Sequence, residues 1–428
     1  GIPLIDRGAT KQSLSQLDVN SIERVEIVEG PMSVVYGTDA LAGVINIITK
    51  KGDGYSEENT WRVGARVQEE SMGKEYDFFK DKGLHNESID LGFNHKSGLF
   101  VNGGYTRNNH GGWQGDLTGR EKRWHPKDQA LMNGMFGFQN RNMNVWYRLD
   151  FLDEKIFGPN NGSELQPEKV SDKDFLTKRY THQLQSDWKL DNRLDVHAAL
   201  SYQDYKRRTR TTESDLSTGE KWLSSAEASQ DITQYKAWIA RATVAWNIAP
   251  EFSVQPGVEY QWTQGEGGRI DGTPKVSDLA FCLSAEYKPW EWLSLRPGVR
   301  TFIVADYDAP IAIPSVLTKF KLTKHMDLRL SYAYGFRSPT LQELYFSFHN
   351  DNHDIDGNPD LKAEYSHNIT GSVAYRVLHS EKIHLTTTLS GFYNDFRDKI
   401  SLAQNVDIPN YNTYYNIDRY KTVGGSLE

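Results

Sequence analysis

The sequence predicts an all-β fold, a transmembrane antiparallel β-barrel that begins near residue 59, and three observations support it. Apolar and polar residues alternate over long stretches, short turns alternate with long polar connections, and no run of roughly 18 apolar residues occurs. Strands that cross a membrane turn only every second side chain toward lipid. A hydrophobic content of 38% is therefore compatible with a barrel.

The stretch that begins at Leu194 shows the alternation clearly. Its apolar side chains share one face of the predicted strand and are expected to contact lipid: Leu194, Val196 and Leu200. Its polar side chains share the opposite face and are expected to line the lumen: Asp195, His197 and Ser201. Charge is thus confined to one side of the strand.

The connections between the predicted strands also follow a rule. Short turns lie near residues 96–98, 140–142, 191–193 and 324–326. Long polar connections are predicted at residues 108–127, 153–175, 209–230, 265–277 and 339–365. Short turns at one rim and long loops at the other are typical of an outer-membrane barrel, and we count about 15 to 16 strands.

Charge and cysteine content exclude several classes of protein. The formal net charge is -8 and no long basic run occurs, so nucleic acid is not an expected partner. Cys282 is the single cysteine, which excludes a disulfide within the chain. No Gly-x-Ser-x-Gly, His-Glu-x-x-His or Cys-x-x-Cys spacing occurs, so no catalytic residues are predicted and an enzyme is not expected.

The first fifty residues differ from the rest because two apolar runs flank a Gly-Pro turn. The runs cover residues 22–31 and 42–50, with Tyr36-Gly37 between them. Gly37 and Gly43 would allow one backbone segment to pass close to another, as in a small sheet packed inside a barrel wall. A barrel of this many strands is too wide for its own side chains to fill, so the segment is expected to occupy the lumen.

This N-terminal block resembles the end of the plug domain of TonB-dependent outer-membrane receptors, in which I-E-R-I-E-V-x-R-G-P precedes Y-G and A-x-G-G-V-I-N-I-I-T-K. The resemblance implies that residues 1–52 are the C-terminal part of the plug and residues 53–428 a partial barrel, out of about 22 strands. Glu29 stands where the family usually has arginine. Arg24 is therefore the candidate for a plug-to-barrel ion pair, with Glu364 as its predicted partner.

Two further sequence boxes resemble the same family and flank one long loop. The boxes are Gly335-Phe336-Arg337-Ser338-Pro339 and Asn358-Pro359-Asp360-Leu361-Lys362-Ala363-Glu364. The resemblance implies energy-coupled import of a scarce ligand across the bacterial outer membrane, with the plug moved by the TonB-ExbB-ExbD complex through a segment N-terminal to this chain. Outer-membrane lipid, a small metal complex and a surface lipoprotein are the other partners it suggests. A passive porin, an adhesin and an outer-membrane enzyme are the alternatives.

The loop between the boxes is the predicted ligand site. Receptors for haem in this family have a histidine between such boxes, so His349 or His353 is the candidate axial ligand. Three aromatic side chains could contact the porphyrin: Tyr345, Phe346 and Phe348. Related boxes also occur in receptors for ferric siderophores and cobalamin, which remain alternatives.

Calcium is a second hypothesis for this loop. Asp354 and Asp356 precede Gly357 in a pattern similar to half of an oxygen-ligand calcium loop. The closing glutamate is out of register, because Ala363 takes its position and Glu364 follows. No cofactor is required for transport, so haem and Ca²⁺ are predicted only as bound ligands.

Overall fold

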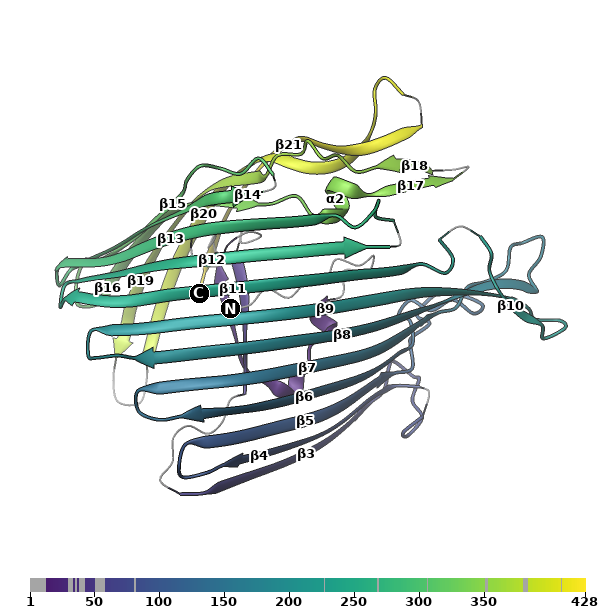
Figure 1. The fold of residues 1–428 in the computed structure, drawn as a ribbon, viewed down its shortest axis with the longest axis horizontal. Coiled ribbons are helices and arrows are strands. Elements are labelled where there is room, and N and C mark those ends of the chain that lie inside the picture. The colour runs from purple at the N-terminus through teal and green to yellow at the C-terminus, as the bar shows by residue number, and fades with distance from the viewer. Residues whose placement is uncertain are drawn as a thin grey trace.

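The computed structural model describes residues 13–29, 34, 37, 43–50, 58–80, 82–226, 228–267, 269–305, 307–350, 353–379, 384–408 and 410–428. One large antiparallel sheet, curved into a barrel, accounts for most of them (Figure 1). The described helices are short, and none is long and apolar enough to cross a membrane.

Sixteen long strands form the barrel wall within the described residues. They are β3 (Thr60–Glu70), β4 (Leu84–Asn94), β5 (Leu99–His110), β6 (Lys127–Gln139), β7 (Met143–Gly158), β8 (Lys169–Lys189), β9 (Leu194–Asp215), β11 (Ile232–Ala249), β12 (Phe252–Glu266), β13 (Lys275–Trp290), β14 (Leu293–Ala305), β15 (Ile313–Lys321), β16 (Met326–Arg337), β19 (Glu364–His379), β20 (His384–Gln404) and β21 (Tyr411–Leu427). This agrees with the predicted number, and successive members of the list pair antiparallel.

The shorter elements belong to the N-terminal segment or to the loops. They are η1 (Ser13–Gln16), η2 (Val19–Ser21), β1 (Ile22–Glu29), β2 (Gly43–Thr49), β10 (Lys221–Leu223), α2 (Leu341–Tyr345), β17 (Ser347–Asn350) and β18 (His353–Asp356). β1 and β2 pair antiparallel in a sheet of their own. Figure 1 shows this segment, in purple, behind the front wall of the barrel.

Two of the long connections predicted from sequence are about half strand. β7, β8 and β9 extend well into the predicted loops at 153–175 and 209–230, and β8 and β9 pair without interruption from Lys169↔Asp215 to Lys189↔Asp195. Above the lipid, both faces of a strand contact water or protein. The sequence there no longer alternates between apolar and polar residues, although the backbone hydrogen bonds between the strands continue. Hydrophobic periodicity therefore could not detect these extensions.

The predicted faces of β9 are confirmed. Leu200 is 40% exposed on the outer surface, whereas Ser201 is 1% exposed. Tyr205, two pairs further along the same inner face as Ser201, packs with Leu341 in the interior. The barrel is therefore polar inside and apolar outside at this level, as a membrane barrel requires.

Candidate functional site

Gln16 joins the N-terminal segment to the barrel wall. The side chain is 3% exposed, and its amide donates a hydrogen bond to Glu154 Oε1 at 2.8 Å. Arg179 donates to Gln16 Oε1 at 3.1 Å and to the Gln16 backbone carbonyl at 2.9 Å. Glu154 and Arg179 project inward from β7 and β8, so this segment lies in the lumen and is held by polar contacts.

A second set of polar contacts follows directly in the chain. Asp18 caps η2 by accepting from the Asn20 backbone N–H at 3.0 Å, and Thr106 Oγ1 of β5 donates to the same carboxylate at 3.0 Å. The Asn20 amide donates to Asn86 Oδ1 at 3.1 Å. Burial raises the pKa of Asp18 above its usual value. The interface between this segment and the wall is thus polar over several residues.

The predicted pair between Arg24 and Glu364 is wrong. Arg24 bonds to Glu23 at 3.0 Å and to Glu26 at 2.8 Å, both on its own strand, and its side chain is 55% exposed. Glu364 instead accepts from Arg337. The carboxylates that Arg24 contacts lie one and two residues away on the same strand. A pair with Glu364 would instead require the β1–β2 hairpin to lie against β19.

A buried charge cluster, which we call the Glu259 cluster, lies where the sequence predicted none. Glu259 on β12 accepts from Arg241 on β11 and from Arg300 on β14, each at 2.5 Å, and Glu259 and Arg300 are 3% and 2% exposed. Gly37, with φ +85°, lies against it, because a Cβ at that position would be 2.9 Å from Glu259 Oε1. The only sequence signal was the Tyr-Gly pair in the N-terminal block.

Cys282 lies beside the Glu259 cluster. On β13 it is directly across from Gly257 on β12 and from Arg300 on β14. The thiol is half-buried, and its Sγ would be 2.7 Å from a Cβ at Gly257. Since Arg300 faces the lumen, Cys282 faces the lumen as well.

Arg337, in the first of the two boxes, organises the loop between them. Its guanidinium donates to Glu343 at 2.9 and 3.1 Å and to Glu364 at 2.9 and 2.6 Å. Glu343 also accepts from the Thr340 backbone N–H at 2.7 Å and so completes the N-terminal cap of α2. Each of these side chains is less than one-fifth exposed. The box residues therefore act as supports of the loop.

The three aromatic residues predicted to contact a ligand have separate environments. Phe346 is 8% exposed and forms a β-bridge with Ile270, and Tyr345 packs beside buried Leu341 and Leu344. Phe348 is covered by the guanidinium of Arg269 at 4.0 Å from the ring centroid. They form no single flat surface in this conformation.

Both ring nitrogens of His349 are hydrogen bonded within the β17–β18 hairpin. Nδ1 contacts Asp354 Oδ1 at 2.6 Å, and Nε2 contacts Asp356 Oδ1 at 3.0 Å and Ser347 Oγ at 3.1 Å. The hydrogen bond to Asp354, together with the Asp356 charge, raises the pKa of His349. The side chain of His353 lies outside the described residues.

The calcium hypothesis gains no support from this hairpin. The carboxylates of Asp354 and Asp356, its two predicted ligands, contact His349. In the part of the chain that the structure describes, no group of three or more His, Cys, Asp or Glu side chains is arranged to hold a metal ion.

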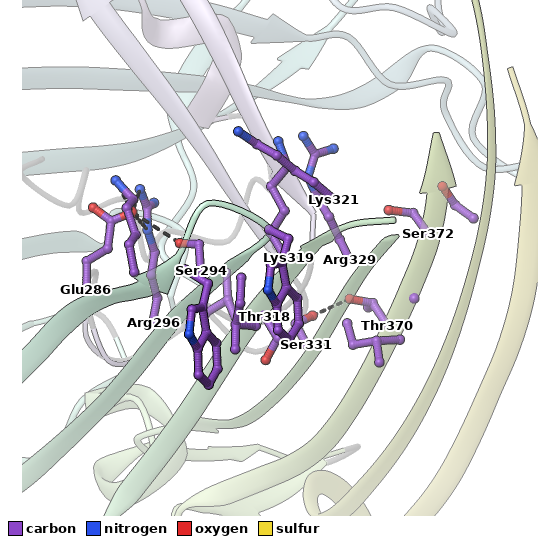
Figure 2. A pocket seen from close by; sticks show the side chains of 18 of the residues that line it. Glu286, Ser294, Arg296, Thr318, Lys319, Lys321, Arg329, Ser331, Thr370 and Ser372 are labelled. Atoms are coloured by element: carbon purple, nitrogen blue, oxygen red, sulfur yellow. Dashed lines mark hydrogen bonds and ion pairs between the residues drawn. The ribbon is translucent and has the colours of Figure 1, made fainter. Parts of the chain in front are cut away.

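A cavity of about 1810 Å³ lies in the half of the lumen nearest the short turns (Figure 2). Its lining includes five cationic side chains: Lys288, Arg296, Lys319, Lys321 and Arg329. Trp290 and Trp292, also in the lining, stack with ring centroids 5.2 Å apart. Three carboxylates also line the cavity, those of Glu251, Glu286 and Glu291, so its cations exceed its anions by two. The cavity thus combines a net positive charge with flat aromatic surface.

Two of the cations in this cavity are uncompensated. Glu286 accepts from Arg296 at 2.9 Å and from Lys288 at 3.0 Å, and Lys319 pairs with Asp327 at 3.3 Å. Among the described residues, Lys321 and Arg329 have no carboxylate within ion-pair distance. Figure 2 shows both extending into the cavity beside Lys319.

Comparison with known proteins identifies the family. Residues 227–428 match the model described as TonB dependent receptor-like, beta-barrel, and residues 1–44 match the TonB-dependent Receptor Plug Domain. The chain belongs to the TonB-dependent receptor family. That membership accounts for the order of plug and barrel along the chain.

Relatives of this TonB-dependent receptor include the iron-regulated outer membrane virulence protein of Vibrio cholerae serotype O1, 26% identical over 403 residues, which are 90% of this chain and 54% of that protein. The chain therefore spans about half the length of its curated relatives. Haemoglobin and haemoglobin-haptoglobin-binding protein C of Haemophilus influenzae is 38% identical over 82 residues, 19% of this chain and 7% of that protein. The siderophore receptor PirA of Pseudomonas aeruginosa has the same fold, with a TM-score of 0.70, 15% identity, and 95% and 69% of the two chains covered.

These comparisons confirm the predicted family, the outer-membrane location and a receptor rather than an enzyme. Apart from the Tyr36-Gly37 pair, no feature of the sequence indicated the receptor's Glu259 cluster or the Gln16 contacts. Both depend on which residues of distant strands face one another.

Proposed function

We propose that the complete receptor imports an anionic ferric siderophore across the outer membrane, with the TonB-ExbB-ExbD complex supplying the force that moves the plug. The similarity to an iron-regulated outer membrane protein over 90% of this chain supports iron as the metal. The cationic lining of the cavity is the observation that favours an anionic chelate.

Lys321 and Arg329 are the central residues of this proposal. Two uncompensated cations in a lumen attract an anion, and low-dielectric walls strengthen the attraction. Iron(III) bound by catecholate or carboxylate groups has a net negative charge, and its flat aromatic rings could contact Trp290 and Trp292. The cavity lies near the short-turn rim, so it would serve the ligand on its way out of the barrel.

The contacts of the plug are compatible with displacement. Gln16, Asn20 and Asp18 meet the wall through hydrogen bonds. Val34 of the same segment adds an apolar contact, because it is buried in a cluster with Ile313 and Phe336 of the wall. Because water replaces each bond on release, its net contribution is about 0.5–1.5 kcal/mol between neutral groups and about 1.5–3 kcal/mol where a carboxylate accepts. A pulling force could therefore release the plug without unfolding the wall.

The test is uptake of radioactive iron by cells that express the full-length gene and lack their own iron receptors. Anionic ferric chelates would be compared with a neutral chelate and with haem, with and without an intact TonB complex. We expect energy-dependent uptake of the anionic chelates. The double variant Lys321→Gln, Arg329→Gln should lower uptake about tenfold, as expected for the loss of a charge-assisted contact.

The matched control is Lys96→Gln, which removes an exposed cation at the same rim but outside the cavity. Uptake that persists without the TonB complex would indicate a passive porin. Equal uptake by the double variant and the unmodified receptor would remove the cavity from the transport path.

Haem is the second candidate, favoured by the local similarity to a haemoglobin-binding protein. In the present conformation His349 uses both nitrogens, so His353 would be the axial ligand unless the hairpin rearranges. Growth on haem and the absorbance of bound haem would be compared for His349→Ala, His353→Ala and the double variant. Unchanged growth and spectra in the double variant would contradict haem binding by this loop.

A further inference from the structure

The outer wall formed by β16, β19, β20 and β21 has an apolar band that defines its lipid-facing side. Leu330, Ile369 and Leu389 are 47%, 54% and 60% exposed on it. The strand registers place these three side chains on the same face. Large exposed aliphatic side chains on a barrel wall are expected where it contacts hydrocarbon.

A charged cluster, which we call the outer-wall patch, follows the apolar band toward the long-loop rim on the same face. Its members are His367, Asp395, Arg397, Arg419 and Lys421. His367, Asp395 and Lys421 lie directly across from one another on three adjacent strands. β20 begins at His384 beside the short-turn rim, so a membrane-crossing length of about 9–11 residues ends close to Asp395. The patch is therefore at the outer membrane–water interface.

The patch has more positive than negative charge. Asp395, 8% exposed, accepts from Arg397 at 3.0 Å and from Arg419 at 2.8 Å. The two guanidinium side chains are 39% and 53% exposed, and Lys421 is exposed as well. One carboxylate thus orients two arginines and neutralises only part of their charge. Asp395 takes two N–H donors of each guanidinium group, and Tyr365 hydrogen bonds to Arg397, so the remaining N–H groups of the two arginines can bind a second anion.

Aromatic side chains border the patch along β16 and β19. Tyr334 and Tyr365 stack with centroids 5.5 Å apart, and His367 meets both rings edge-on at 5.1 and 5.9 Å. Tyr332 contacts His367 Nδ1 through its hydroxyl at 3.0 Å. Such rings are favoured at the headgroup level, where one end is apolar and the other polar.

The geometry points to a binding site for a phosphorylated glycolipid of the outer leaflet, with its phosphate on Arg397 and Arg419 and its acyl chains against Leu330, Ile369 and Leu389. Charges facing lipid are costly at the bilayer centre and tolerated at the interface, where an anionic headgroup can pair with them. Guanidinium groups bind phosphate through two parallel hydrogen bonds. Lys421 adds a third cation, and the stacked rings of Tyr334 and Tyr365 offer flat surface to the sugar rings. The site is independent of the cargo in the lumen.

The test uses the full-length receptor in detergent with defined probes: a diphosphorylated, acylated glucosamine disaccharide, the same lipid without phosphate, and inorganic phosphate. Native mass spectrometry would count bound lipid, and titration would give affinities. We expect the unmodified receptor to prefer the phosphorylated lipid. The double variant Arg397→Gln, Arg419→Gln should weaken lipid binding at least tenfold. The conservative variant Arg397→Lys should keep part of the affinity that Arg397→Gln loses.

Arg107→Gln is the matched control, because Arg107 pairs with Asp128 near the same rim on another part of the wall, and both are about half exposed. It should leave binding at the patch unchanged. Lys421→Gln, at an exposed position, should weaken binding without affecting folding, and heat-resistant migration in detergent would verify assembly of every variant. Equal binding of both lipids, equal binding by the double variant, or displacement of lipid by inorganic phosphate alone at millimolar concentration would overturn the assignment.

Discussion

The Arg337 guanidinium donates two hydrogen bonds to the Glu364 carboxylate, at 2.9 and 2.6 Å, and so ties the end of β16 to the start of β19. The Glu364 carboxylate also accepts from the Ile400 backbone N–H of β20 at 2.7 Å. Three strands of the wall therefore meet at one partly buried ion pair. Because Arg337 also binds Glu343, the segment between the paired residues 337 and 364, which lie 27 positions apart, starts and ends at the same guanidinium.

Replacing Arg337 should destabilise this end of the barrel. Arg337→Ala leaves Glu343 and Glu364 partly buried without their cation, at a cost of about 3–5 kcal/mol. Arg337→Lys should lose less, because it keeps the charge but not the planar fork. Thermal unfolding of the full-length receptor in detergent would measure both, with Arg376→Lys, which removes one bond to Asp327, as control. Identical melting of Arg337→Ala and the unmodified receptor would contradict this role.

Gln16→Leu should weaken the attachment of the plug. The substitution removes the two hydrogen bonds that join the Gln16 side chain to Glu154 and Arg179, at about 1.5–3 kcal/mol for each bond to a charged group. Gln129 still donates to Glu154, and the Gln16 backbone carbonyl still accepts from Arg179. Cells expressing this variant should become more sensitive to large antibiotics that an intact plug excludes. Gln114→Leu, in an exposed loop, provides the control. Unaltered sensitivity would show that other contacts hold the plug.

Gly37→Ala should disturb the Glu259 cluster. The residue has φ +85°, and a left-handed conformation costs a non-glycine residue about 1–2 kcal/mol. The new methyl group would also press on Glu259 Oε1. Gly272→Ala is the matched control, since Gly272 has φ +66° but no atom near its Cβ position. We expect the midpoint of urea unfolding to fall further for Gly37→Ala than for Gly272→Ala. Equal falls would mean that the backbone conformation alone causes the loss of stability and that the contact with Glu259 contributes nothing.

The β17–β18 hairpin should be more stable in mild acid than in base. His349 has a folded-state pKa above its ordinary value of about 6.5, so its ion pairs with Asp354 and Asp356 are fully present below that value. They are lost as the pH rises through the raised folded pKa. Hydrogen exchange of residues 347–356, corrected for intrinsic rates, should therefore accelerate toward pH values of about 9.

His349→Gln supplies the control for this pH dependence. The glutamine cannot become charged, so protection in the variant should not change with pH over the same range. A pH response that survives in His349→Gln would assign the effect to another group.

The barrel was predictable from sequence because its physical cause is local. Leu200 and Ser201 face opposite sides since neighbouring strand residues always do, and lipid outside with water inside fixes which is apolar. The upper parts of β8 and β9 were missed because no lipid imposes that alternation there. The local signal ends where the membrane ends.

The site was only partly predictable because its key contacts are not local. The two boxes located Arg337 and Glu364, but their pairing was not foreseen, and Glu364 was assigned to Arg24 instead. Gln16 lies in an ordinary polar stretch, and only the register of β7 and β8 brings Glu154 and Arg179 to it. Which carboxylate faces which guanidinium is a property of the folded barrel.

The single thiol of the chain gives the lumen a built-in reporter. Cys282 lies on the inner face beside Arg300 and Glu259, the pair that contacts Gly37 of the plug. A fluorescent label on this sulfur would sense the surroundings of Glu259 and Arg300, which change when Gly37 of the plug moves away. Plug movement in working cells could thus be followed at an unaltered position of the native sequence.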